Sequence, residues 1–197
     1  MIASRAQTPA TTRYSVDDLD QFPNDGKLRE LVDGQIVEWG VTTAYHGWLL
    51  VALSHALRAY VLERQLGLVV GGDPMVMIQG SRYDARGPDV AFFRRGNIPP
   101  DLGAAASSTV PDFVIEVLSP SDRAGMVQEK VLDWLRSGVR LLWYVDPETR
   151  HTIVYDDNRI SGVGPDETLD GGPVVPGFTV RLADFYRELE ALQVPIE

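Results

Sequence analysis

The sequence predicts an α/β domain in which a central mixed β-sheet is flanked by helices. Segments with the two-residue periodicity of strands alternate with segments whose apolar residues recur every three or four positions. Strands that a helix connects can pair in parallel, whereas the hairpins predicted near both ends pair antiparallel. The predicted sheet is therefore mixed. The 197 residues, 44% of them hydrophobic and 23% charged, suit one folded core of ordinary globular composition.

Residues 28–39 predict a β-hairpin, because Asp33-Gly34 is a favoured two-residue turn between two strand-like arms. The register that this turn sets gives two cross-strand pairs, Arg29 with Glu38 and Glu30 with Val37. A helix follows over residues 44–65, where apolar residues recur at helical spacing, and Gly67 is its predicted end.

The rest of the chain alternates strands, loops and helices. Short apolar runs bounded by turn residues predict the strands, and stretches rich in glycine, proline and small residues predict the loops. The predicted strands cover residues 68–79 (broken by glycines and a proline), 88–93, 111–119, 139–146, 151–156 and 174–180. The predicted loops cover 96–109 and the acidic stretch 157–172, and the predicted helices cover 121–137, capped by the turn Ser119–Asp122, and 183–192.

Composition excludes several kinds of site. The longest apolar run has six residues, far short of the roughly 20 that a membrane span needs, so we expect no membrane contact. Because cysteine is absent, disulfides, thiolate zinc sites and cysteine nucleophiles are excluded, which suits a cytoplasmic location. Residues 1–13 contain two arginines and no acid and predict a flexible tail without a secretory signal, followed by a single domain over residues 14–197.

Two carboxylates interrupt or precede strands that are otherwise apolar. Glu116 lies among residues that are apolar on both strand faces, so it needs a cation, a metal ion or a raised pKa. The alternative is an ion pair or a carboxylate that reaches solvent at the strand end. Asp89 follows Pro88 and precedes the apolar run 90–93, where the alternative is a turn or capping role. Two carboxylates from neighbouring strands can hold a hard divalent cation.

Two further residues are candidates for the same site. Glu30 shares a strand face with two apolar residues, although an exposed edge-strand glutamate explains it equally. Lys130 is one of only two lysines beside 16 arginines, and it lies at the edge of the apolar stripe of its helix. From there its amine can point towards the carboxylate strand, or the side chain can extend over the core to water. His46 can face the same site, but a capping or surface histidine is the favoured interpretation.

Several motifs together resemble the PD-(D/E)XK nuclease superfamily. These motifs are Pro88-Asp89-Val90, the run DFVIEVLSPS from Asp112 to Ser121, Lys130, and Gly138-Val139 before LLWYVDP. More specifically, residues 14–186 resemble the family of restriction-endonuclease domains long catalogued as a domain of unknown function. The resemblance implies a restriction-endonuclease-like fold and hydrolysis of DNA phosphodiester bonds with Mg²⁺ or Mn²⁺.

The resemblance also implies roles for individual residues. Asp89, Glu116 and the Val117 carbonyl would hold the metal ion, Glu30 would assist, and Lys130 would orient or activate water. Leu118 departs from the superfamily pattern, because the motif lysine usually stands two residues after the glutamate. In this family a lysine on the next helix takes over, which here is Lys130.

DNA is the partner that this hypothesis requires, although the net charge of the chain is −10. Residues 82–95 hold four arginines against two aspartates, so DNA is expected to dock there, away from the acidic stretch 156–170. A homodimer would suit cleavage of both strands of a duplex. Two rival hypotheses are a catalytically silent nucleic-acid-binding module on the same fold and a protein-interaction domain whose acids only pair with arginine.

Overall fold

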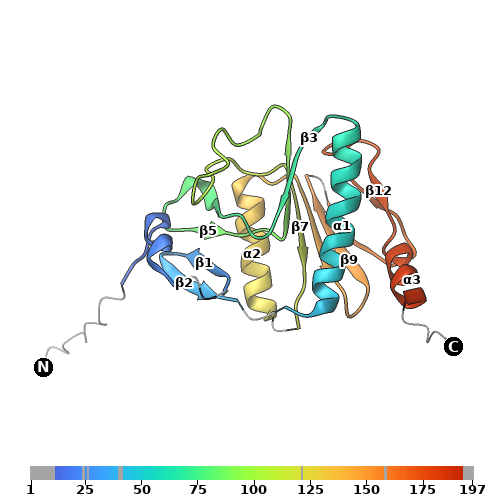
Figure 1. Ribbon diagram of the computed structural model, residues 1–197, viewed down its shortest axis with the longest axis horizontal. Coiled ribbons are helices and arrows are strands. Elements are labelled where there is room, and N and C mark those ends of the chain that lie inside the picture. Colours follow the sequence, from blue (N-terminus) through green and yellow to red (C-terminus); the bar gives the residue numbers. More distant parts are fainter. Residues whose placement is uncertain are drawn as a thin grey trace, which may run out of the picture.

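A computed structural model describes residues 12–192, apart from residues 24, 26, 40, 41, 121 and 158. Its centre is a six-stranded β-sheet (Figure 1). The strands in spatial order are β10 (Ile160–Val163), β9 (His151–Asp156), β8 (Leu141–Asp146), β7 (Phe113–Val117), β6 (Val90–Arg94) and β3 (Gly67–Gly71). Only β7 and β8 are parallel among these described neighbours, and the other pairs are antiparallel. The predicted mixed sheet is therefore confirmed.

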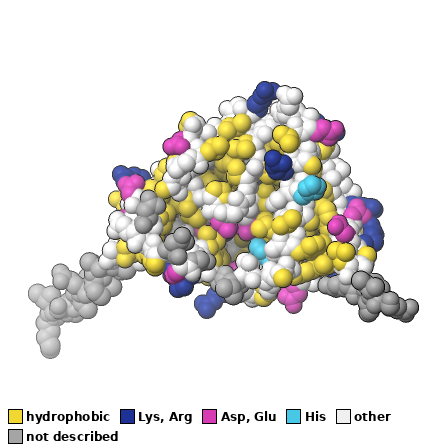
Figure 2. Space-filling model, in the orientation of Figure 1, with side chains coloured by type: hydrophobic (Ala, Val, Ile, Leu, Met, Phe, Trp, Pro, Cys, Tyr) yellow, Lys and Arg dark blue, Asp and Glu magenta, His cyan; other side chains and the backbone are white. Residues whose placement is uncertain are grey.

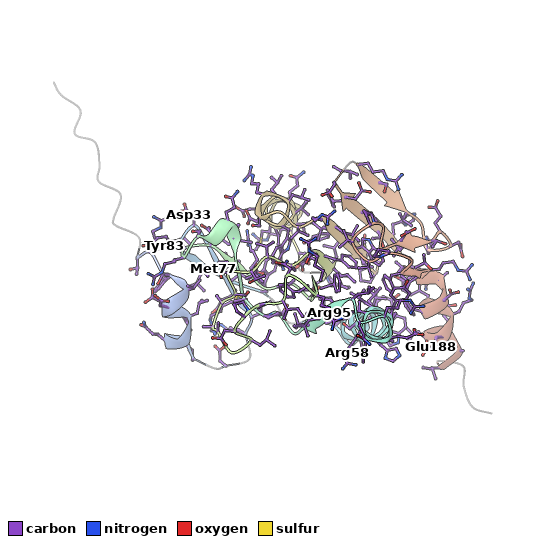
Figure 3. The ribbon with its side chains drawn as sticks, turned by 90° about the horizontal axis from the view of Figure 1, so that it is seen from above. Asp33, Arg58, Met77, Tyr83, Arg95 and Glu188 are labelled. Carbon is purple, nitrogen blue, oxygen red and sulfur yellow. The ribbon has the colours of Figure 1, made fainter. Side chains whose placement is uncertain are left out.

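Helices cover both faces of this sheet. α1 (Ala44–Glu63) and α2 (Ala124–Ser137) lie on opposite faces, as Figure 3 shows with both helices viewed nearly end-on. α3 (Leu182–Leu192) joins the core on the α1 side. Alternate residues of β7 divide between the two cores: Ile115 packs on the α1 side and Val114 on the α2 side, beside Trp134. Burial of both faces explains why this strand is apolar at every position except Glu116.

A smaller sheet lies beside the central one. Its strands in spatial order are β2 (Gln35–Glu38), β1 (Arg29–Val32), β5 (Ala85–Arg86) and β4 (Val76–Met77), with the 3₁₀ helices η1 (Val16–Gln21) and η2 (Ile78–Gly80) alongside. Figure 3 places this end of the molecule, marked by Asp33 and Tyr83, opposite the end that holds Glu188 of α3. The predicted hairpin register is confirmed, with Arg29 opposite Glu38 and Glu30 opposite Val37.

The C-terminal third contains more strand than predicted. The stretch 157–172, predicted as a loop, includes β10 and β11 (Leu169–Asp170). The strand predicted at 174–180 is reduced to β12 (Thr179–Val180), which pairs with β11 as a separate two-stranded sheet. Glycine and acidic residues in this stretch indicated turns, but pairing with β9 and β12 overrides that local preference.

The start of α2 also differs from the prediction. The helix begins at Ala124, and its N-cap is Arg123, which makes no side-chain capping bond. Asp122 instead accepts a hydrogen bond from the Ser119 amide (2.9 Å) within the preceding turn. The turn Ser119–Asp122 precedes the helix as predicted, but the Asp122 carboxylate closes this turn and does not cap the helix.

No helix in the described part of the chain is long and apolar enough to cross a membrane. Residues 1–11 of the predicted N-terminal tail lie outside the described residues. Arg13, at the end of that predicted tail, contacts Asp33 at 3.0 Å.

Candidate active site

The register of the central sheet brings Asp89 and Glu116 to opposite positions. β6 and β7 are antiparallel with Val90 opposite Ile115, so the residue before β6 lies across from Glu116. Both carboxylate residues line a pocket of about 510 Å³ that Lys130 of α2 also lines. Three of the four predicted side chains therefore surround a single cavity.

Lys130 is buried between two carboxylates and is only 6% exposed. Its Nζ donates to the Gly87 carbonyl (2.9 Å) and to Glu116 Oε2 (2.9 Å), and it lies 3.1 Å from Glu30 Oε1. Burial would lower the pKa of Lys130, but the carboxylates of Glu116 and Glu30 outweigh it and hold that pKa well above its usual value. The amine points towards the carboxylate strand, and the alternative of a side chain that extends to water is wrong, because three acceptors inside the fold match the three N–H groups of the ammonium.

Glu30 is fully buried and does not line the pocket. Its Oε2 accepts from Arg86 Nη1 (3.1 Å), and its Oε1 accepts from the Gly87 amide (2.9 Å) beside Lys130. Gly87 thus binds Glu30 through its N–H and Lys130 through its carbonyl. Glu30 therefore holds the Lys130 ammonium in place from outside the pocket. The alternative of an exposed edge-strand glutamate is wrong.

Glu116 is held by two donors from α2. Lys130 Nζ contacts one carboxylate oxygen, and Trp134 Nε1 donates to the other at 2.8 Å. Burial raises the pKa of Glu116, and the charges of Asp89 and Glu30 add to this effect while Lys130 opposes it. Trp134 lies one helical turn after Lys130, on the same side of α2. Trp134 is one of the apolar residues of α2, and no local pattern indicates that its indole N–H would bind this carboxylate.

His46 is buried in the site and is not a surface or capping side chain (5% exposed). Its Nε2 lies 2.9 Å from the Val117 carbonyl and 3.6 Å from Asp89 Oδ2. The same Asp89 oxygen accepts a hydrogen bond from the Val117 amide (2.7 Å). Asp89 raises the pKa of His46 against the opposing effect of burial. His46 belongs to the site because the first turn of α1 meets the end of β7, a tertiary contact without a local sequence signal.

Two further carboxylates line the pocket. Asp73 and Asp122 stand beside Asp89 and Glu116 in its wall, and Figure 2 shows acidic side chains and a histidine gathered at a hollow in this face. Burial, followed by the charge of Asp89, raises the pKa of Asp73 to about 6, and burial raises that of Asp122. Sequence reasoning missed Asp73, although an aspartate in the otherwise apolar segment 68–79 is the same kind of signal as Asp89.

The donor set suits a hard cation that keeps several waters. Among the described residues, no three acidic or histidine side chains come close enough together to hold a metal ion by themselves. Asp89 and Glu116 supply two carboxylates, and Mg²⁺ characteristically takes one or two together with water and phosphate oxygens. In the part of the chain that the structure describes, Asp89 Oδ1 has no hydrogen-bond partner, since the contacts of this side chain use Oδ2. These residues fit a Mg²⁺ or Mn²⁺ ion.

The basic stretch 82–95 presents fewer unpaired positive charges than its sequence suggests. Arg86 is buried, donating to Glu30 and, at 2.6 and 2.9 Å, to Asp133. Two of the other three arginines are paired with acids, Arg82 with Asp17 and Arg94 with Asp112. The prediction counted charges along the sequence, whereas the fold directs the Arg86 charge inward to neutralise Glu30.

Replacing Asp73 with asparagine should stabilise the metal-free protein at pH 8. Folding buries the Asp73 carboxylate and raises its pKa from 3.8 in the unfolded chain to about 6 in the folded protein. At pH values where both states are ionised, this difference lowers the unfolding free energy by roughly 1–3 kcal/mol. The folded state binds the extra proton as the pH falls from about 7 to 4, so the gain should disappear near pH 4. Asparagine also tolerates the positive φ of this residue (57°).

Urea denaturation in EDTA at pH 8 and pH 4 measures this effect. Asp166→Asn, at an exposed aspartate, is the matched control and should change the unfolding free energy little at either pH. An Asp73→Asn protein no more stable than the parent at pH 8 would show that Asp73 carries no buried charge.

Comparisons with known proteins identify the family of the chain and support its fold. A model of the Uma2 family, described as "Putative restriction endonuclease", matches residues 16–183. A solved structure, that of a putative nuclease of the DUF820 family from Anabaena variabilis, superposes with a TM-score of 0.77 at 18% sequence identity. The alignment covers 89% of this chain and 98% of that one, and at this identity it shows the fold. A search of curated proteins found no match. Because the family model covers most of the sequence, the chain belongs to the Uma2 family of putative restriction endonucleases.

Proposed function

We propose that the protein is a divalent-metal-dependent endonuclease that hydrolyses phosphodiester bonds of DNA. The observation that carries the proposal is the buried Glu116 carboxylate beside Asp89 and Lys130 in one pocket. Membership of a family described as restriction endonucleases supports a nucleic-acid substrate. Four carboxylate residues line the pocket against two lysines and one histidine, so a divalent cation would relieve their mutual repulsion.

Asp89, Glu116 and the Val117 carbonyl are the groups that would hold the cation. When bound, Mg²⁺ or Mn²⁺ supplies the positive charge that neutralises the phosphate and lowers the pKa of an attacking water. Lys130 orients the Glu116 carboxylate and opposes the rise in its pKa, and its ammonium can stabilise negative charge that develops on the phosphate. Glu30 is a positioning residue, because it touches Lys130 and not the pocket.

His46 fixes the backbone of the site. It contacts the Val117 carbonyl, while Asp89 accepts from the Val117 amide. Strand β7 is thereby held by both side chains next to Glu116. Rigid support of this kind keeps ligand groups within the small tolerance that catalysis requires.

A catalytically silent nucleic-acid-binding module is the second candidate, and one observation favours it. Each N–H of the Lys130 ammonium already faces a protein acceptor, in Gly87, Glu116 and Glu30. The ammonium can contact a substrate oxygen only when one of these acceptors takes another partner. A module in which Lys130 keeps all three protein acceptors would bind DNA without cutting it.

Calorimetric titration with Mn²⁺ and a plasmid-nicking assay test the proposal together. The parent protein should bind Mn²⁺ in the pocket that Asp89 and Glu116 line, and it should nick supercoiled plasmid in Mg²⁺ or Mn²⁺ but not in EDTA. Protein that binds DNA but cuts it in no divalent metal would establish the silent module instead. Protein that binds neither metal nor DNA would contradict both candidates. Sedimentation of the active species tests the accompanying proposal that the enzyme works as a homodimer.

A further inference from the structure

A second and larger pocket, of about 930 Å³, adjoins the candidate active site. Ser119 and Asp122 line both cavities. Two consecutive residues at the start of α1 also line different cavities: Tyr45 lines the second pocket and His46 lines the candidate active site. The second pocket therefore lies directly beside the place where the proposed function puts the scissile phosphate.

The aromatic ring of Tyr45 lines the second pocket and packs against the rings of two residues that do not line it. Tyr45 stacks on Trp48 with ring centroids 5.8 Å apart and planes inclined by 13°, and it lies 6.3 Å from the ring of Tyr186. Arg150 also lines the pocket, and its guanidinium lies 4.6 Å from the centre of the Tyr186 ring. Val127 and Leu118 add aliphatic surface. A flat, apolar group entering the pocket would meet an already ordered surface, which lowers the entropic cost of binding.

The charges of the second pocket disfavour a phosphate group. Three carboxylate residues, Asp122, Asp146 and Glu148, line it against the single guanidinium of Arg150. Gln128 adds an amide that can both donate and accept hydrogen bonds. This wall suits an uncharged planar group that presents N–H donors. In a DNA substrate whose phosphate occupies the neighbouring pocket, the nucleobase has that chemistry.

We propose that the second pocket receives an unstacked nucleobase next to the scissile phosphate, so that the preferred substrate is single-stranded or locally unpaired DNA. This inference rests on the proposed function, because it needs a nucleic acid in the adjoining pocket. Bases in an intact duplex are stacked and paired and cannot enter a lateral pocket without being extruded. An unpaired strand enters without that cost.

A single glycine allows the pocket to be filled without disturbing its walls. Gly125 lines it on the first turn of α2, and a Cβ built there meets no heavy atom within 4 Å. Gly125→Trp should therefore occupy the cavity. Gly162 of β10 has equally open surroundings and lines neither pocket, so Gly162→Trp is the matched control.

The probes are a fluorescent 12-nucleotide single strand, an abasic 12-mer with the same phosphates, and the duplex of the first strand. Binding is measured by anisotropy in Ca²⁺, with gels confirming that the strands stay intact. The parent and Gly162→Trp should bind the single strand about tenfold more tightly than the abasic strand, the usual effect of one base stacked on aromatic side chains. Gly125→Trp should bind both strands alike, and its affinity for the duplex should change less than threefold.

Two results would overturn the inference. One is a parent that cuts plasmid but binds the intact and abasic strands equally, which leaves the nuclease proposal standing and removes the base pocket. The other is a Gly125→Trp protein that loses affinity equally for both strands, because the pocket would then contact the DNA backbone. A parent that neither binds nor cuts DNA would remove the proposed function, and this inference with it.

Discussion

Replacing Lys130 with methionine is expected to lower plasmid cleavage by ~10²–10⁴, the usual effect of one positioned acid–base or electrostatic group. Methionine keeps most of the apolar stem but removes the ammonium that contacts Glu116 and Glu30. The electrostatic stabilisation that Lys130 would give to the phosphate is lost. Glu116 loses the ammonium that contacts it and keeps Trp134 as a donor, so its pKa should rise further.

The same replacement should also destabilise the fold, contrary to what a boundary lysine would suggest. Removing one partner of a buried ion pair typically lowers the unfolding free energy by about 3–5 kcal/mol, because the remaining charge is left uncompensated. The double variant Glu116→Gln, Lys130→Met removes both charges of that pair and should recover much of the loss without recovering cleavage. Urea denaturation beside the nicking assay separates the two effects. Lys130→Met protein that cuts as fast as the parent would remove Lys130 from the mechanism.

The elements that the sequence predicts well are those whose signals are local. Asp33-Gly34 sets the hairpin register by itself, and the apolar periodicity of residues 44–65 marks α1. Glu116 could be identified because a carboxylate in a strand buried on both faces requires a partner. Asp89 could be expected on a neighbouring strand because two carboxylates so placed can hold a hard divalent cation.

The remaining features depend on tertiary contacts that leave no local trace. Arg86 looks like a surface arginine in a basic stretch, but β5 carries it inward to Glu30 and Asp133. On a helical wheel Lys130 lies at the edge of the apolar stripe. The wheel describes α2 alone, so it does not show the carboxylates of β1 and β7 that bind the ammonium. His46 joins the site only because α1 begins where β7 ends. The role of each of these side chains depends on the partners that another element brings to it.

Replacing Glu116 with glutamine should abolish most divalent binding and lower cleavage by about 10³ or more while leaving the protein folded. Glutamine keeps the shape of the side chain but removes the charge that would ligate Mg²⁺ or Mn²⁺. Even supporting residues outside the ligand set are typically worth about 10–100-fold in metal affinity, so loss of a ligand should cost at least that. Lys130 keeps Glu30 as its counter-charge, which is why this variant should unfold less easily than Lys130→Met.

Calorimetric Mn²⁺ titration, plasmid nicking and urea denaturation on one preparation distinguish these effects. Glu129→Gln makes the same chemical change on α2 at a side chain that is 58% exposed, and it should bind Mn²⁺ and cut as the parent does. A Glu116→Gln protein that binds Mn²⁺ with parental affinity would place the cation elsewhere in the pocket, beside Asp73 and Asp122. Glutamine cannot replace the negative charge, but it can still accept the hydrogen bond from Trp134. A folded but inactive variant would therefore show that activity is lost because the metal ion is not bound, and not because β7 packs less well against α2.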